Sequence, residues 1–171
     1  MELTHVTHTF DPVYDENAGL LILGSFPSVK SRENQFYYGH PQNRFWKVVA
    51  GVFGDAVPGT IQEKREFLLK NHIALWDVIA SCDIAGSSDG SIRNVVANDM
   101  HKILGNAPIR AIFANGNTAY RLFIKYCKKE GQPEVYRLPS TSPANAAWSV
   151  ERLVTAWGEV IRKGCGGDEE K

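Results

Sequence analysis

Short apolar runs recur along the chain and are separated by longer amphipathic segments. Four such runs are LLIL (20–23), IALWDVI (73–79), IRAIFA (109–114) and EVYRL (134–138). Their length and composition predict buried parallel strands. The other segments carry apolar residues at helical spacing and predict helices over 43–53, 60–71, 98–106, 117–129 and 147–163. Strands that alternate with helices predict an α/β fold whose parallel sheet is covered on both faces.

Local signals place the ends of two of these helices. Thr60 and Glu63 have the spacing of a capping box, and Asn98 can cap the helix that stops near Gly105. Neither an internal repeat nor a linker divides the chain. We therefore expect residues 1–171 to form one domain, with 1–17 as an N-terminal extension and 164–171 as a disordered tail.

The bulk composition is that of an ordinary globular protein. The chain has 171 residues, 43% of them hydrophobic and 22% charged. A chain of this length can form a stable hydrophobic core without disulfides or a structural metal. Its apolar runs are shorter than the roughly 18 residues of a membrane span, and MELTHVTHTF has no signal-peptide pattern. Cys82, Cys127 and Cys165 are odd in number and widely spaced. They predict reduced thiols in the cytoplasm and no metal site, and a monomer is the default expectation.

The charge is unevenly distributed along the chain. A net charge of zero argues against a nucleic-acid partner. Residues 24–47, however, hold four basic residues against one acidic residue, and 101–137 hold seven against two. Solvated helix faces are the alternative explanation for 101–137. In 24–47 the charges are interleaved with aromatic residues, so there we expect the basic side chains to face phosphate.

The polar and Gly- or Pro-marked segments follow the ends of the predicted strands. They are 24–42, the stretch after Trp76-Asp77, NGN (115–117) and PSTSPANA (139–146). In a parallel sheet, ligands bind beyond the carboxyl ends of the strands. The four segments therefore predict a single site at one edge of the sheet.

The first of these segments begins with GSFPS. Gly24 permits close approach of the backbone, Pro27 stiffens the loop, and the amides of Ser25 and Phe26 can meet an anion or a base edge. A serine hydrolase is excluded by the lack of G-x-S-x-G, and a phosphate loop by the lack of its lysine motif. A purely structural turn is the alternative interpretation.

The same segment continues with YYGHPQNRFW. Tyr37 and Tyr38 offer rings that can stack on a base, whereas Phe45 and Trp46 fall inside a helix and are expected in the core. Asn43 stands where that helix begins, so a helix cap is the alternative to a catalytic role. His40 can titrate near neutral pH, with a structural role as the alternative.

The last segment, LPSTSPANA, leads from a strand end into the final helix. Ser140, Thr141 and Ser142 offer hydroxyl groups and amides near a helix N-terminus, which is a natural place for phosphate. An elaborate helix cap is the alternative. Asp77 either caps a turn or reads an N–H group of a base, and Asn115 lies at the next strand end.

Taken together, these motifs resemble the uracil-DNA glycosylase superfamily. GSFPS corresponds to the first motif of that superfamily, G-x-x-P-[GS], and LPSTSPAN to its second Pro-Ser-containing loop. The longer set, with YYGHPQNRFW and IALWDVIASC, resembles the hypoxanthine-DNA glycosylase branch. The resemblance covers residues 18–163. It implies a three-layer α/β/α sandwich around a four-stranded parallel sheet and metal-free, cofactor-free excision of bases from double-stranded DNA.

The resemblance also implies roles for individual residues. Asn43 would orient the attacking water, with Asn34 as the weaker candidate. Phe26 would stack on the flipped base, with Tyr38 as the substitute. The other expected members of the base pocket are Gly24, Ser25, Pro27, His40, Asp77 and Asn115. The loop of Ser140, Thr141, Ser142, Pro143, Ala144 and Asn145 would grip phosphates and fill the space left by the flipped nucleotide.

Two departures from the superfamily pattern bear on the substrate. Position 25 is Ser, where the most active uracil enzymes have Asp and the mismatch enzymes Asn, and no His follows the leucine of the second motif. Both differences imply weak stabilisation of a uracil anion and favour hypoxanthine. The alternatives are a uracil or mismatch glycosylase, an inactive relative that binds DNA or a nucleotide, and a small-molecule hydrolase or transferase on a similar sheet.

Overall fold

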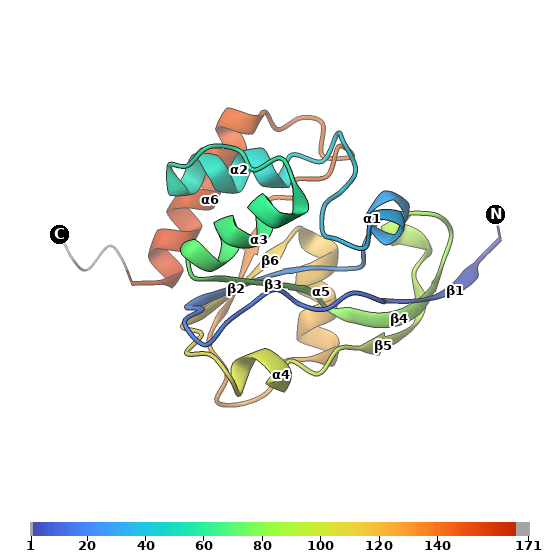
Figure 1. Cartoon of the computed structure of the whole chain (residues 1–171). Helices are drawn as coiled ribbons and strands as arrows, with labels where there is room; N and C mark the ends of the chain where they lie inside the picture. Colours follow the sequence, from blue (N-terminus) through green and yellow to red (C-terminus); the bar gives the residue numbers. More distant parts are fainter. Residues whose placement is uncertain (1, 167–171) are drawn as a thin grey trace.

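The protein is an α/β sandwich with a small second sheet at one end (Figure 1). The computed structural model describes residues 2–166. Its main sheet is parallel, with strand order β3-β2-β6-β7. These strands are β2 (Leu20–Gly24), β3 (Ile73–Asp77), β6 (Ala111–Asn115) and β7 (Val135–Leu138). The predicted α/β/α sandwich with a four-stranded parallel sheet is confirmed.

Helices cover both faces of the main sheet. The helices of the described chain are α1 (Val29–Asn34), α2 (Phe45–Phe53), α3 (Ile61–Lys70), α4 (His101–Leu104), α5 (Asn117–Tyr126) and α6 (Val150–Gly164). The connections β2-to-β3 and β6-to-β7 run in opposite directions across the sheet, so right-handed crossovers put their helices on opposite faces. Figure 1 shows α2, α3 and α6 on one face and α4 and α5 on the other. The direction of winding therefore reverses between β2 and β6, which creates a ligand crevice at their carboxyl ends.

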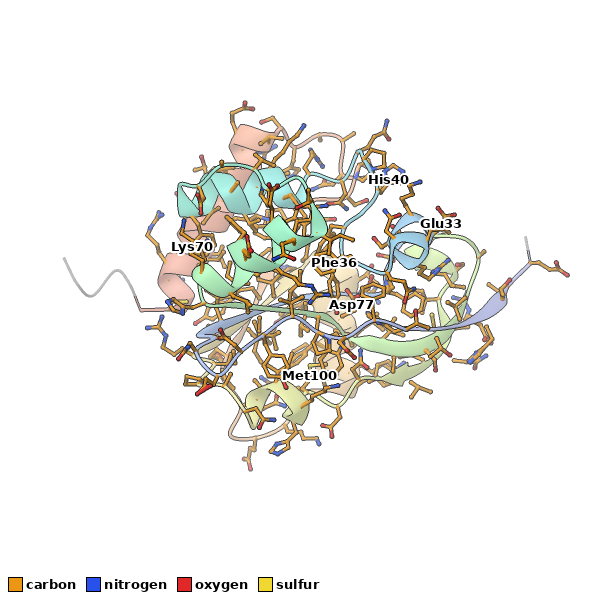
Figure 2. All side chains as sticks on the ribbon, in the orientation of Figure 1. Glu33, Phe36, His40, Lys70, Asp77 and Met100 are labelled. Atoms are coloured by element: carbon orange, nitrogen blue, oxygen red, sulfur yellow. The ribbon has the colours of Figure 1, made fainter. Side chains whose placement is uncertain are left out.

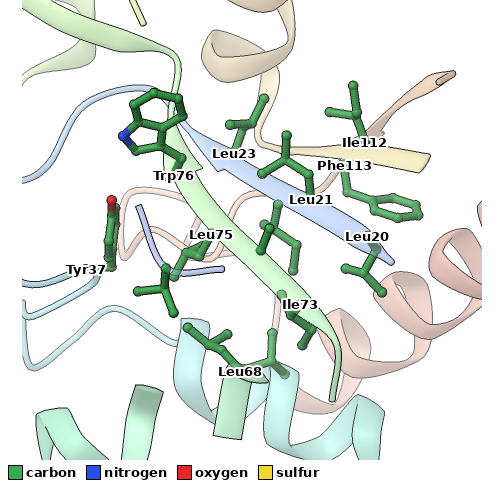
Figure 3. Close-up of a cluster of buried hydrophobic side chains, with 14 of the residues drawn as sticks. Leu20, Leu21, Leu23, Tyr37, Leu68, Ile73, Leu75, Trp76, Ile112 and Phe113 are labelled. Atoms are coloured by element: carbon green, nitrogen blue, oxygen red, sulfur yellow. The ribbon is translucent and has the colours of Figure 1, made fainter. Parts of the chain in front are cut away.

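The core lies between the central strands and the helices above them. All of β2 and β3 is buried, and their side chains pack with Leu68 of α3 and Phe113 of β6 (Figure 3). Phe45 and Trp46 are 0% and 6% exposed, which confirms that they belong to the core. Because this packing fixes β2 and the edge strand β3, it also fixes the residues that stand at their ends.

Several boundaries differ from the sequence predictions. The predicted strand 73–79 is two strands, because the chain turns at Val78 and continues as β4 (Ile79–Ile84) in another sheet. The Asn98 cap is wrong. Its side-chain amide donates to the backbone oxygen of Asp77 (2.8 Å), and α4 begins later, at His101. The capping box of Thr60 and Glu63 is confirmed.

The second sheet is antiparallel and was absent from the sequence prediction. Its order is β1-β4-β5, with β1 (Thr4–Thr7) and β5 (Arg93–Ala97) on either side of β4. A short 3-10 helix, η1 (Asp89–Ser91), joins β4 to β5. Residues 1–17 are therefore more than an extension, since β1 pairs with β4 and Val13 bridges Leu75.

The C-terminal helix runs into the segment that was predicted to be a disordered tail. Of the predicted tail 164–171, Gly164 is still helical, and residues 167–171 lie outside the described part of the chain. Within residues 2–166, no helix is long and apolar enough to cross a membrane.

Candidate active site

A cavity of about 520 Å³ opens at the carboxyl ends of β2, β3 and β6. Its walls include Asn43, every residue predicted for base binding, and the predicted DNA loop except Asn145. The predicted residues that line it are Gly24, Ser25, Phe26, Pro27, Tyr38, His40, Asn43, Asp77, Asn115, Ser140, Thr141, Ser142, Pro143 and Ala144. Figure 2 shows Asp77 at the end of β3 and His40 above it, on the loop between α1 and α2. The four strand-end segments thus form one site. Asn34 is exposed in α1, outside this cavity.

Asn43 connects the first motif to the second. Its Oδ1 accepts the backbone N–H of Phe45 (2.9 Å) and the hydroxyl of Thr141 (2.8 Å). A backbone N–H can only donate, so the atom facing it is the oxygen, and the orientation of the amide is settled. The N-cap of α2 is Arg44, and Asn43 precedes it but accepts the first N–H of the helix. The helix-cap explanation is therefore only partly right. The Asn43 Nδ2 has no partner among the described residues, and every buried side-chain nitrogen has one, so this NH2 group is open to solvent.

Thr141 and Asn115 give this connection a fixed direction. The backbone N–H of Thr141 donates to Asn115 Oδ1 (3.1 Å), so Asn115 Nδ2 is left to donate to the Thr141 hydroxyl (3.0 Å). The Thr141 hydroxyl then has its own proton free for Asn43 Oδ1. Thr141 is 0% exposed, so the prediction that it contacts DNA is wrong. It is a buried connector that holds Asn43 in place.

Arg44 holds the second motif against the first. Its guanidinium donates to the backbone oxygens of Thr141 (3.3 Å), Ser142 (2.8 Å), Asn145 (3.0 Å) and Trp148. Arg32 similarly donates to the carbonyls of two loop residues, Pro27 and Gly86. For Arg44 the prediction that the basic side chains face phosphate is wrong, because its guanidinium is used on backbone oxygens inside the protein. Arg32 uses only two of its N–H groups in this way.

The loop after β7 has a more limited DNA-facing surface than predicted. The Ser140 and Ser142 hydroxyl oxygens accept the backbone N–H groups of Ser142 (3.0 Å) and Ala144 (3.1 Å), so their protons remain for another acceptor. Asn145 donates its side-chain amide to the Ser140 carbonyl (2.9 Å) and lines an adjacent groove. The exposed tip consists of Pro143 and Ala144.

Phe26 and Tyr38 supply aromatic surface from the first motif. Phe26 lines the cavity, but only 9% of it is exposed because it packs on the second sheet. Tyr38 stacks on Phe45, with ring centroids 4.0 Å apart, and its hydroxyl oxygen accepts a hydrogen bond from Asn115 Nδ2 (3.2 Å). Burial and the neighbouring Asp77 raise the pKa of Tyr38 far above its usual range. Its hydroxyl therefore stays protonated.

Asp77 is a buried carboxylate at the floor of the cavity. It is 3% exposed, and its Oδ2 lies 2.9 Å from His8 Nε2. His8 follows β1 and is enclosed by Phe10, Tyr37 and Phe26. His8 was missed in the sequence because it lies in the segment interpreted as an extension, far along the chain from its partner.

The loop Ser87–Gly90 forms a wall that the sequence did not reveal. Asp89 Oδ1 accepts the Ser25 hydroxyl (3.1 Å), which joins this loop to the first motif. Although Asp89 is exposed overall, desolvation of its carboxyl group, assisted by the charge of Asp77, raises its pKa, while Ser25 and Arg121 act in the opposite direction. Its loop belongs to the unpredicted second sheet, so no strand-end signal pointed to it.

Gly24 is required by the crowding at this floor. A Cβ at this position would lie 2.5 Å from Asp77 Oδ1 and 2.8 Å from Tyr38 Oη. We expect Gly24→Ala to reduce single-turnover base excision at least about tenfold, because both groups must move from their positions. Gly19→Ala is the matched control, since its Cβ would be 3.8 Å from Arg110. Equal rates for the two variants would show that Gly24 is not needed at the floor.

Comparisons with known proteins agree with this geometry. Residues 12–160 match the uracil DNA glycosylase superfamily. The chain belongs to that superfamily. Hypoxanthine DNA glycosylases of Methanosarcina acetivorans and Methanosarcina barkeri are 37% and 36% identical to it, over 90% of this chain and 96% and 97% of theirs. This uracil-DNA glycosylase superfamily member also resembles a solution NMR structure of a protein from M. acetivorans that was provisionally named a uracil DNA glycosylase. The TM-score is 0.73 and the sequence identity 35%, over 91% of this chain and 96% of that one.

Membership makes the protein a DNA glycosylase, as the motifs predicted, and damaged DNA the class of substrate. In residues 2–166, no group of three or more His, Cys, Asp or Glu side chains has the arrangement of a metal site. The chemistry available at the site consists of oriented amides, hydroxyl groups and two carboxylates.

Proposed function

We propose that this glycosylase removes hypoxanthine from double-stranded DNA and leaves an abasic site for base excision repair. The observation that carries this proposal is the directed network Asn115–Thr141–Asn43, which leaves the Asn43 NH2 group open beside the cavity. The two relatives named as hypoxanthine DNA glycosylases, which match nearly the whole chain, support the choice of base.

Asn43 would act by orienting a water molecule. An amide is a poor base near pH 7, and both lone pairs of Oδ1 are already occupied by Phe45 and Thr141. Nδ2 can therefore donate to one lone pair of the water and leave the other directed at C1′. Fixing a nucleophile in this way removes much of the entropic barrier to its attack.

Two carboxylates near the cavity would favour the charge that develops on the sugar. The C1′–N9 bond breaks with its electron pair leaving on the base, and the sugar becomes oxocarbenium-like. The water oxygen then bonds to C1′, and the proton that the water loses neutralises the departing base anion. Asp77 and Asp89 both line the cavity, and negative groups fixed in a water-poor site stabilise a cationic transition state.

The rim of the cavity would grip the DNA backbone around the flipped nucleotide. The free hydroxyl protons of Ser140 and Ser142 can donate to phosphate oxygens. The exposed Pro143–Ala144 tip is placed to fill the gap in the base stack. Flipping costs a few kcal/mol and is easiest at mispairs, so we expect faster excision where hypoxanthine is mispaired.

Uracil is the second candidate substrate. The relative of known structure was provisionally named a uracil DNA glycosylase, and uracil shares the N–H and carbonyl pattern of hypoxanthine. Against it, Ser25 offers a hydroxyl that is already committed to Asp89. We expect uracil to be removed more slowly than hypoxanthine.

The test is an excision assay on duplexes that hold one hypoxanthine, uracil, xanthine or normal adenine. At enzyme excess, alkali should cleave the hypoxanthine strand first, uracil and xanthine more slowly, and adenine not at all. Cleavage without alkali would indicate an amine nucleophile such as Lys30 and contradict the proposed hydrolysis. If every lesion stays intact, the protein is an inactive DNA- or nucleotide-binding relative.

A further inference from the structure

The floor of the cavity presents a hydrogen-bond acceptor to the base, in addition to the electrostatic effect of Asp77 on the sugar. Asp77 Oδ2 is occupied by His8, while Oδ1 has no partner among the described residues. Every buried side-chain oxygen in the described chain has a partner, so Oδ1 must reach the cavity that Asp77 lines. The side chains of His8 and Asp77 are only 3% and 5% exposed.

A donor stands beside this acceptor. Asn115 Nδ2 donates to the Tyr38 hydroxyl, so the proton of Tyr38 is free to be donated elsewhere. Asp77 Oδ1 and Tyr38 Oη both lie within 2.8 Å of the point where a Gly24 Cβ would stand. The floor therefore offers one acceptor and one donor next to each other, and the absent Gly24 side chain leaves both uncovered.

We propose that Asp77 Oδ1 and Tyr38 Oη recognise the lactam edge of the flipped base, and that His8 is the positioning residue that holds Asp77 as an acceptor. This inference rests on the proposed function and specifies the chemical class of its substrate. Hypoxanthine presents N1–H as a donor and O6 as an acceptor on adjacent atoms. Asp77 accepts from N1–H, and Tyr38 donates to O6.

The same arrangement rejects adenine. Adenine has a lone pair at N1 and an amino group at C6. Its N1 acceptor would therefore face the acceptor Asp77 Oδ1, and its amino donor would face the Tyr38 hydroxyl donor. Deamination reverses both groups at once, and a site with one fixed acceptor and one fixed donor detects that reversal. Leaving buried polar groups unpaired is what makes such discrimination strong.

His8 is needed because a carboxylate can rotate. Donation from His8 Nε2 fixes the plane of the carboxyl group and keeps Oδ2 away from the base. The ring itself is held by Phe10, at a centroid distance of 4.4 Å, and by Tyr37, at 5.9 Å. His8→Phe removes the donor and preserves an aromatic ring in this enclosure. His8→Gln offers an amide that can donate to the same oxygen.

The test measures binding with uncleavable duplexes, so it does not depend on the chemical step. One duplex carries hypoxanthine and the other unsubstituted purine, each on a 2′-fluoro sugar that resists cleavage. Purine is nearly isosteric but has a lone pair at N1 and no O6. We expect the wild type to bind the hypoxanthine duplex about 10- to 100-fold more tightly, the range of one or two charge-assisted hydrogen bonds.

Variants of His8 and Tyr38 test whether the preference for the hypoxanthine duplex comes from the floor of the cavity. We expect His8→Phe and Tyr38→Phe each to weaken hypoxanthine binding about tenfold and to leave purine binding nearly unchanged, and His8→Gln to restore part of the preference. Tyr38→Phe keeps the test decisive if His8→Phe does not fold. His5→Phe is the matched control, because His5 lies 2.9 Å from Asp83 in an exposed pair on β1, away from the cavity.

The outcomes separate this inference from the proposed function. A wild type that binds both duplexes equally, or variants that weaken both alike, would overturn recognition by the floor even if hypoxanthine is excised. A preference that behaves as expected in a protein without excision would overturn the proposed function and leave the recognition intact.

Discussion

Replacing Asn43 by Ala is expected to lower single-turnover excision of hypoxanthine by about 10²- to 10³-fold. The NH2 group that would hold the attacking water is lost, and Thr141 loses the acceptor of its hydroxyl proton. Binding of the uncleavable duplex should stay within about threefold of the wild type, because the floor and rim of the cavity are unchanged. Rapid-quench assays and fluorescence anisotropy measure the two quantities.

Asn43→Ser separates catalysis from helix capping. Ser can still accept the N–H of Phe45 that Asn43 accepts, whereas Ala leaves it unpaired and should lower the free energy of unfolding by about 1 kcal/mol. We expect Ser to restore that stability and to remain inactive. A Ser variant with wild-type excision would mean that Asn43 is only a cap.

Replacing Arg44 by Met should damage both stability and activity. The backbone oxygens of Thr141, Ser142, Asn145 and Trp148 lose a shared charged donor, and partly buried carbonyls without partners are costly. We expect the free energy of unfolding to fall by about 2–4 kcal/mol and excision to fall about 10²-fold, because Thr141 no longer holds Asn43 in place. Urea titration and single-turnover kinetics measure these effects.

Lys47→Met is the control for Arg44, since Lys47 is an exposed basic residue in the first turn of α2, the helix that Arg44 precedes. It should change the free energy of unfolding by no more than about 0.5 kcal/mol. Hydrogen exchange should increase in residues 140–149 for the Arg44 variant only. If Arg44→Met folds stably and excises normally, the loop is held by other contacts.

The sequence predicted the parts of the site that follow the strands of the main sheet. Gly24, Asp77 and Asn115 end β2, β3 and β6, and parallel strands bring their carboxyl ends together whatever their exact limits are. Thus the location of the cavity followed from the order of elements, even though the strand predicted over 73–79 was too long. The resemblance added Asn43, whose local signal was only that of a helix cap.

The sequence could not predict interactions between segments with weak local patterns. His8 and Asp89 belong to short strands or loops of the antiparallel sheet, whose pairing joins residues as far apart as Thr4 and Ile84. Likewise, the basic composition of 24–47 did not show that Arg44 points inward to carbonyl groups. Composition reports how many charges a segment has, whereas the fold decides which of them reach solvent.

The attachment of the Ser87–Gly90 wall has a consequence for how this enzyme can evolve. The loop joins two strands of the antiparallel sheet and contributes nothing to the parallel sheet that carries Asn43, Asn115 and the rim. Insertions or exchanges in this loop that keep Asp89 can therefore reshape one side of the pocket while the reacting groups on the parallel sheet stay in register. We expect sequence changes in this loop to be the easiest route by which related enzymes change their specificity toward larger or smaller bases.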